Sequence, residues 1–184
     1  MLKLVGVSGT LAGNKTSKAV YDVLAAAKML DKSVEIELID LRDYDLSFAD
    51  GSPLAYFEDD TWPVAEKIMS ADCLVFGTPI YQASISGVLK NLLDHIPEYA
   101  FKNKVTGIVA TGLSEKHFLV TEYQLKPILS YFKGLVPTEN VFVQNDCFSL
   151  ESEEIIDNLV AKRLHNLADE ILFLQGSINE RMKR

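Results

Sequence analysis

The sequence predicts a doubly wound α/β domain built around a five-stranded parallel sheet. Short apolar runs alternate with longer stretches in which apolar residues recur at helical spacing. Runs such as Cys73-Leu74-Val75-Phe76 are apolar at consecutive positions, which is typical of strands covered on both faces. A chain of 184 residues with 48% apolar content can form one sizeable core, so we expect residues 1–184 to be a single domain.

The expected elements alternate along the whole chain. Segments rich in β-branched and other apolar residues predict strands over 3–7, 34–39, 72–77, 104–110 and 139–143. Helical periodicity predicts helices over 17–30, 62–70, 86–96, 116–133 and 152–175. Because right-handed crossovers return the chain to the same edge, this alternation specifies parallel strands with helices on both faces. Five strands without internal repeats favour the order 2-1-3-4-5 over a six-stranded dinucleotide-binding sheet.

Pro127 lies inside the fourth predicted helix, four residues after Tyr123. Proline has no N–H to donate to the carbonyl of Tyr123, and its ring crowds that carbonyl. The spacing therefore predicts a kink or a π-bulge around Tyr123.

Charge and composition exclude several functional classes. A net charge of -8 disfavours nucleic acid as the main partner, because such proteins usually carry a basic face. No apolar stretch approaches the roughly 20 residues that span a bilayer, and the first residues turn glycine-rich too soon for a signal-peptide core. We therefore expect a cytoplasmic protein with no membrane partner. Cys73 and Cys147 are isolated in the sequence, so neither a CxxC redox pair nor a zinc ligand set is expected.

The loop after the first predicted strand has the composition of an anion site. Gly9 and Gly13 let the backbone approach a ligand, and the helix that follows offers free N–H groups. A capped βα turn without a ligand is the alternative. The glycine spacing fits neither a dinucleotide fingerprint nor a P-loop. The side chains of Thr10, Asn14, Thr16 and Ser17 can add hydrogen-bond donors for a monophosphate here.

The loop after the third predicted strand can bind the edge of a planar heterocycle. Pro79 lacks an N–H and stiffens the turn, which leaves neighbouring amides and carbonyls free to bond a ring. Read in isolation, Tyr81 could be an ordinary rim aromatic, and Ser84 or Ser86 an ordinary helix cap. The candidate residues for the ring are Thr78, Pro79, Ile80, Tyr81, Gln82 and Ser84.

These residues belong to a longer and more specific signature. Thr78-Pro79-x-Tyr81 is followed by Ser86-Gly87-x-Leu89-Lys90-Asn91-x-Leu93-Asp94. This segment closely resembles the isoalloxazine loop of the NADPH-dependent FMN reductase family. Ala110-Thr111-Gly112, His117 and residues 123–129 are similar to the branch of that family that serves two-component sulfonate monooxygenases.

The resemblance implies a flavodoxin-like fold with an FMN site. The arginine that the family commonly has after its first Gly-Ser turn is absent, so we expect Lys15 to supply positive charge at the phosphate. The resemblance also implies a homodimer or homotetramer with Tyr123 at the subunit contact, and a flavin-dependent monooxygenase as a candidate partner. By the same resemblance, Ser8, Thr10, Thr16 and Ser17 would hold the phosphate, residues 79–84 the ring edge, and Thr111 and Gly112 the other rim.

The function that follows is hydride transfer from NADPH or NADH to FMN. The cofactor carries this chemistry, so we expect no catalytic proton-transfer residue and no metal. Two alternatives stay open: an FMN-containing reductase of quinones, azo compounds or chromate, and a flavodoxin-type electron carrier. The Ser86-Gly87-x-Leu89-Lys90-Asn91 signature, which carriers lack, favours the enzyme.

Overall fold

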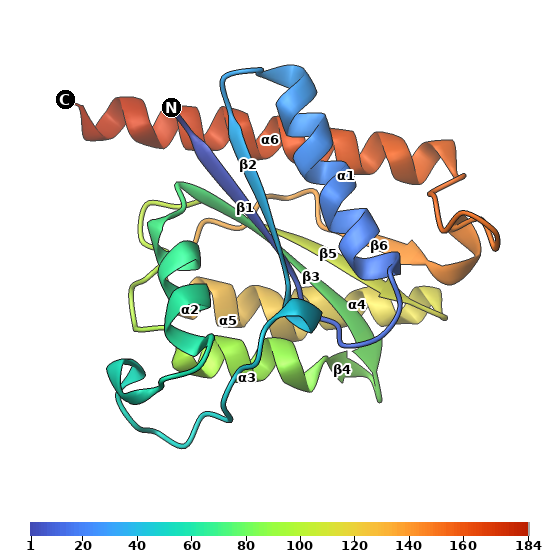
Figure 1. The fold of residues 1–184 in the computed structure, drawn as a ribbon. Helices are drawn as coiled ribbons and strands as arrows, with labels where there is room; N and C mark the ends of the chain where they lie inside the picture. Colours follow the sequence, from blue (N-terminus) through green and yellow to red (C-terminus); the bar gives the residue numbers. More distant parts are fainter. Residues whose placement is uncertain (184) are drawn as a thin grey trace.

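A twisted parallel sheet runs through the centre of the computed structural model, which describes residues 1–183 (Figure 1). Its strand order is β2-β1-β3-β5-β6, and the two-residue strand β4 pairs with β3 alone, in antiparallel fashion. The parallel strands therefore follow the predicted order 2-1-3-4-5. Their bounds are Lys3–Ser8 (β1), Glu35–Asp40 (β2), Cys73–Tyr81 (β3), Thr106–Gly112 (β5) and Val141–Gln144 (β6), and β4 covers Ser84–Ile85.

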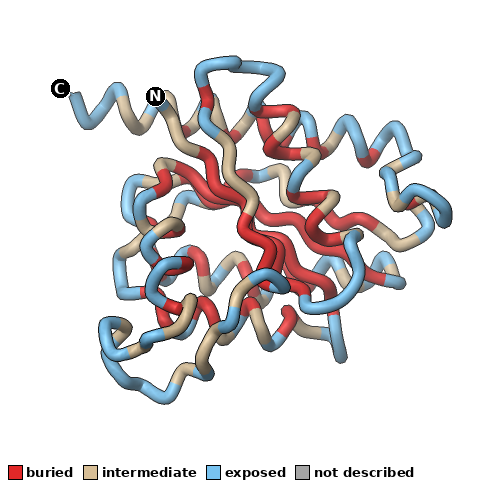
Figure 2. Tube along the Cα trace, in the orientation of Figure 1, coloured by how far each residue is buried: buried red, intermediate tan, exposed pale blue. Residues whose placement is uncertain are grey.

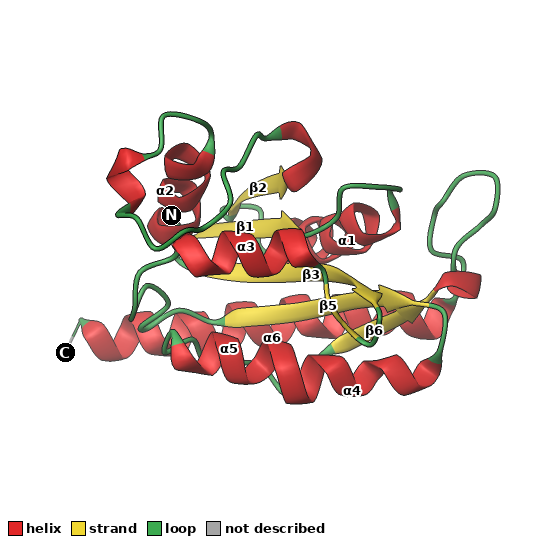
Figure 3. Cartoon of the chain, turned by 90° about the horizontal axis from the view of Figure 1, so that it is seen from below, coloured by secondary structure: helices red, strands yellow, loops and turns green. Residues whose placement is uncertain are grey.

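Helices cover both faces of this sheet (Figures 1 and 3). One face packs against α1 (Lys15–Leu30) and α6 (Asn158–Met182). The opposite face packs against α2 (Thr61–Ser70), α3 (Gly87–His95) and the segment formed by α4 (Phe118–Val120) and α5 (Lys126–Tyr131). The buried residues form a continuous band along the strands (Figure 2). None of the helices in the described part of the chain is long and apolar enough to cross a membrane.

The side chains of β3 are buried on both faces of the sheet, which explains why consecutive residues are apolar. Leu74 and Phe76 point into the core under α2 and α3, whereas Cys73 and Val75 point into the core under α1 and α6. All four are fully buried, because successive side chains of a strand face opposite sides of the sheet. Cys147, the other cysteine, is only partly buried.

The segment around Pro127 departs from a regular helix, as its sequence predicts. Residues Thr121–Leu125 form a π-helical turn between α4 and α5. Pro127 cannot continue the α-helical hydrogen-bond ladder, and the π turn accommodates the carbonyls that lose a donor. The helix expected over 116–133 is therefore a composite of 3₁₀, α and π turns rather than one α-helix.

The last helix begins later than predicted, at Asn158 instead of residue 152. The carboxylate of Asp157 accepts hydrogen bonds from the backbone N–H groups of Leu159 and Val160, which caps α6 at that position. The preceding residues form a loop closed by an antiparallel bridge between Phe148 and Ile155. The predicted start was wrong because these contacts hold the loop away from helical geometry.

Candidate cofactor-binding site

A cavity of about 270 Å³ lies at the carboxyl ends of the central strands. Ligands of doubly wound sheets bind at this edge, where the strand order reverses. Eight of the fourteen residues predicted from the sequence line the cavity: Asn14, Lys15, Thr16, Pro79, Ile80, Tyr81, Thr111 and Gly112. The structure therefore brings together segments from three different loops.

The first wall is the β1–α1 loop and the first turn of α1. Asn14 is the N-cap of this helix, but its side chain makes no cap hydrogen bond, which leaves N–H groups of the first turn available. Gly13 has a φ of 72° with open space beside it, so the backbone here is accessible to a ligand. The Thr16 hydroxyl lies 2.8 Å from that of Thr111 and joins this wall to β5. Such a helix start favours an anion.

The second wall is a hairpin that continues β3 beyond the body of the sheet. Ile80 pairs with Ile85, and Tyr81 pairs with Ser84, so Gln82 and Ala83 form a two-residue turn. Tyr81 is 52% exposed and presents its ring at the rim of the cavity. The predicted loop is thus a defined β-hairpin, and its backbone forms one edge of the cavity.

Six predicted site residues do not line the cavity. The Thr10 hydroxyl donates to the Ala12 carbonyl at 2.8 Å, within the β1–α1 loop. The Thr78 hydroxyl accepts a hydrogen bond from the Ser86 N–H at 3.0 Å, which joins β3 to the start of α3. Both side chains therefore stabilise the loops instead of lining the cavity. The hydroxyl of Ser8 is fully buried and has no hydrogen-bond partner in the described part of the chain. Gln82 and Ser84 lie at the hairpin turn. The six predicted residues outside the cavity lining are Ser8, Thr10, Ser17, Thr78, Gln82 and Ser84.

Arg42 is a cation beside the first wall that the sequence analysis missed. Its guanidinium donates to the Asn14 side-chain oxygen at 2.6 Å and to the Ser17 hydroxyl at 3.4 Å. It also pairs with Asp40 at 2.6 Å, and this hydrogen bond raises the pKa of Arg42 further above its usual range. Lys15, which we expected in this role, instead donates to the Asn145 carbonyl at 3.0 Å. No local motif links Arg42 to the loop, because it follows β2.

Glu153 brings a negative charge to the same wall. It lines the cavity, accepts a hydrogen bond from the Asn14 amide at 2.7 Å and has a φ of 55°, in the left-handed region. The neighbouring Glu154 forms an ion pair with Lys18 at 2.6 Å, which ties the 148–157 loop to α1. The sequence analysis missed Glu153 because it assigned this position to a helix.

His117 also lines the cavity, next to Gly112. Its ring atom Nδ1 is buried and has no hydrogen-bond partner among residues 1–183, and a Cβ at Gly112 would lie 3.1 Å from it. The absence of a side chain at Gly112 therefore leaves room for the imidazole. The family resemblance had marked this position, but the sequence reasoning did not include it in the site.

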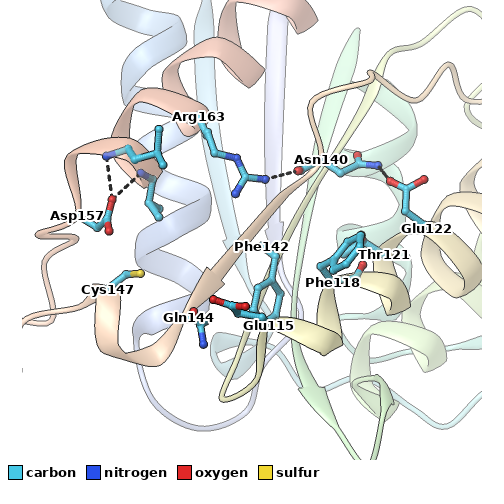
Figure 4. A pocket seen from close by; sticks show the side chains of 12 residues that line it. Glu115, Phe118, Thr121, Glu122, Asn140, Phe142, Gln144, Cys147, Asp157 and Arg163 are labelled. Atoms are coloured by element: carbon cyan, nitrogen blue, oxygen red, sulfur yellow. Dashed lines mark hydrogen bonds between the residues drawn. The ribbon is translucent and has the colours of Figure 1, made fainter.

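A second cavity of about 390 Å³ lies beyond β6 (Figure 4). Arg163 donates to the Asn140 carbonyl at 3.0 Å, and the Asn140 amide donates to Glu122 at 2.7 Å. The bond from Asn140, followed by the bond from Lys126, lowers the pKa of Glu122, which is therefore a carboxylate at neutral pH. These side chains are engaged with one another, and no residue predicted for the site lies in this cavity.

The sequence is similar to a family model and to relatives that are described as flavin reductases. The family model described as NADPH-dependent FMN reductase matches residues 2–147. An NAD(P)H-dependent FAD/FMN reductase of Geobacillus thermodenitrificans is 44% identical over 177 residues, which cover 96% of this chain and 95% of that protein. An NADH-dependent FMN reductase of Pseudomonas fluorescens is 31% identical over 150 residues, 80% of this chain and 79% of its own length.

The fold agrees with that relationship. The solved structure of an NADH:FMN oxidoreductase in its apo form superimposes with a TM-score of 0.79 at 27% identity, covering 96% of this chain and 90% of the other. The hairpin signature, the sheet order and the matched span all point to the same group of proteins. The chain belongs to the NADPH-dependent FMN reductase family.

Proposed function

We propose that this protein is an NAD(P)H-dependent FMN reductase whose flavin binds in the 270 Å³ cavity at the carboxyl ends of the strands. The observation that carries the proposal is the pairing of two walls suited to opposite ends of FMN. One wall is a helix start with free N–H groups, which suits a phosphate. The other is a hairpin backbone with Tyr81 at its rim, which suits a flat ring.

The residues of the cavity fit this cofactor. Asn14, Lys15, Thr16 and the backbone of the first turn of α1 would hold the phosphate, while Arg42 adds positive charge behind Asn14. The hairpin at Pro79–Tyr81 would hold the ring edge, and the rim at Thr111 and Gly112 would close the other side. The His117 side chain also lines this cavity, beside Gly112. Ser8, Thr10, Ser17, Thr78, Gln82 and Ser84 would support these walls rather than touch the open cavity.

Bound FMN supplies the redox chemistry, because its ring accepts a hydride from the nicotinamide. The protein's own part is to hold the ring with one face open and to orient the nucleotide against it. Tyr81, at the rim of the cavity, would cover one edge of the bound ring. No side chain needs to transfer a proton to the reacting atoms, so we assign no acid or base.

The direct test is consumption of NADPH or NADH by the purified full chain with excess FMN and no other protein. Catalytic oxidation with a turnover of about 1–1,000 per second, the usual range of enzymes, is expected. Tyr81→Ala should lower the rate while leaving the unfolding transition in place, because Tyr81 is half exposed at the rim. If neither nucleotide is consumed by folded, FMN-loaded protein, the carrier alternative replaces the reductase. Parallel assays with a quinone and an azo dye identify the final acceptor.

The phosphate end of the site can be tested through Glu153. Glu153→Gln removes a negative charge that lines the cavity beside Asn14, so FMN affinity is expected to rise about tenfold through loss of like-charge repulsion. Riboflavin affinity should change little, because riboflavin has no phosphate. Fluorescence titrations of both flavins measure the difference, and Glu151→Gln in the same exposed loop is the matched control. An equal change for the two flavins would mean that the phosphate binds elsewhere.

The surface around the π turn suits a contact between copies of this chain. Tyr123 is 76% exposed, and Phe118 and Leu119 expose 49% and 44% of their area on the same segment. Exposed apolar groups of this size often mark an interface. We propose a homodimer or homotetramer with Tyr123 at the contact. Tyr123→Glu is then expected to shift the species to smaller mass in sedimentation or light scattering, whereas a monomeric wild-type protein would refute the proposal.

The proposal extends to the domain organisation, the cellular location and a partner of the protein. Two core clusters cover the two faces of a single sheet, which supports a single domain over residues 1–184. A cytoplasmic location, expected from the sequence, is also part of the proposal. A flavin-dependent monooxygenase that consumes reduced FMN is the candidate partner, because a reductase of free flavin needs an acceptor for its product.

A further inference from the structure

The turn of the ring-edge hairpin has a conformation that its residues disfavour. Gln82 and Ala83 have φ angles of 48° and 59°, the pattern of a type I′ turn. Asn-Gly is the common sequence for such turns, because a Cβ is crowded in the left-handed region. Neither residue here is glycine or asparagine, so contacts from outside the turn must hold this geometry.

Gln124 provides those contacts from the π-helical turn. Its amide nitrogen donates to the Ala83 carbonyl at 3.0 Å, and its amide oxygen accepts from the Ser84 hydroxyl at 2.7 Å. A carbonyl can only accept, so the nitrogen of the amide must face Ala83, and the oxygen is left for Ser84. Within residues 1–183, no other side chain outside the hairpin forms a hydrogen bond with Tyr81–Ser84.

The segment that carries Gln124 is itself firmly placed. Leu125, the next residue, is fully buried, and Thr121 at the start of the π turn is 2% exposed and donates to the Phe118 carbonyl at 2.6 Å. Tyr123, the preceding residue, faces solvent. The buried residues of the π turn thus fix the position of Gln124, while Tyr123 of the same turn is exposed.

We infer that Gln124 is a positioning residue that holds the hairpin in the shape that binds the flavin ring. The inference rests on the proposed function. Both hydrogen bonds end on the turn residues and not on the cavity, so Gln124 acts through the backbone of Ala83 and the hydroxyl of Ser84. Because the ring edge is common to FMN and riboflavin, loss of Gln124 affects the two flavins alike, unlike a change at the phosphate end.

The test compares Gln124→Ala with the double variant Gln124→Ala/Ala83→Gly in the full chain. Gln124→Ala is expected to weaken FMN and riboflavin binding by about tenfold each, the size expected for one or two hydrogen bonds. Glycine at position 83 adopts a positive φ without a Cβ clash, so the double variant should recover most of that loss. Glu122→Gln is the matched control, because Glu122 lies in the same π turn and bonds Lys126 and Asn140 instead of the hairpin.

A second measurement does not depend on flavin. Hydrogen–deuterium exchange over residues 79–86 of the flavin-free protein should rise in Gln124→Ala and return toward the wild-type level in the double variant. Unchanged exchange and flavin affinities within twofold of wild type would overturn the inference, as would a loss that Ala83→Gly does not recover. If Gln124→Ala shows the exchange effect but the wild-type protein binds no FMN, the proposed function alone is refuted.

Discussion

Phe76→Ala is expected to lower the free energy of unfolding by about 3–5 kcal/mol, the usual cost of deleting a large aromatic side chain from a core. Phe76 is fully buried at the centre of β3. Its ring packs against Phe101 at a centroid distance of 5.4 Å, and Phe101 in turn packs against Phe132 at 5.1 Å. Alanine would leave a cavity under α2 and α3 that this central strand cannot move to fill.

Chemical denaturation of the flavin-free protein measures this effect. Phe173→Ala is the matched control, because Phe173 on α6 is 72% exposed and its loss should change the free energy of unfolding by about 0.5 kcal/mol or less. Similar destabilisation by the two changes would contradict the core position of Phe76. The midpoint should shift with little change in the denaturant slope if the transition stays two-state.

Gly9→Ala is expected to lower both the free energy of unfolding and the affinity for FMN, because Gly9 lies where the loops of the proposed site meet. Gly9 donates to the Gly77 carbonyl at 2.8 Å and accepts from the Ser86 hydroxyl at 2.5 Å. A Cβ on Gly9 would lie 2.7 Å from the Cβ of Leu89 and 2.9 Å from the Gly77 carbonyl, so the backbone must shift. Such overpacking costs about 1–3 kcal/mol. The shift falls on the first wall of the cavity, and FMN affinity should fall with stability.

Gly87→Ala is the control for Gly9→Ala. Gly87 begins α3, and apart from its chain neighbours and the backbone of α3 itself, no atom of the described residues lies within 4 Å of its added Cβ. The free energy of unfolding should therefore change by about 0.5 kcal/mol or less. Flavin titrations and denaturation of both variants separate a local clash from a general effect of replacing glycine. Unchanged FMN binding in folded Gly9→Ala would show that the β1–α1 loop does not form the site.

Local patterns in the sequence were enough for the sheet order, for the π turn and for the loops that line the cavity. The π turn and the loops depend on residues close together along the chain, whereas the sheet order follows from the alternation of short strand and helix patterns. The consecutive apolar residues of β3 require a strand covered on both faces, and Pro127 removes a donor from its own helix wherever that helix packs. The sequence between Thr78 and Asp94 likewise identified the family, because its residues share one strand–turn–helix unit.

The identity of several groups around the cavity was decided only by the tertiary structure. Arg42 reaches Asn14 from 28 residues away, Glu153 reaches it from 139 residues away, and Gln124 reaches Ala83 from 41 residues away. The start of α6 also depends on the bridge between Phe148 and Ile155. Such contacts form when the sheet and its helices bring distant loops to one edge. A short sequence pattern encodes the backbone geometry of its own segment, but not which side chains from other loops will meet it.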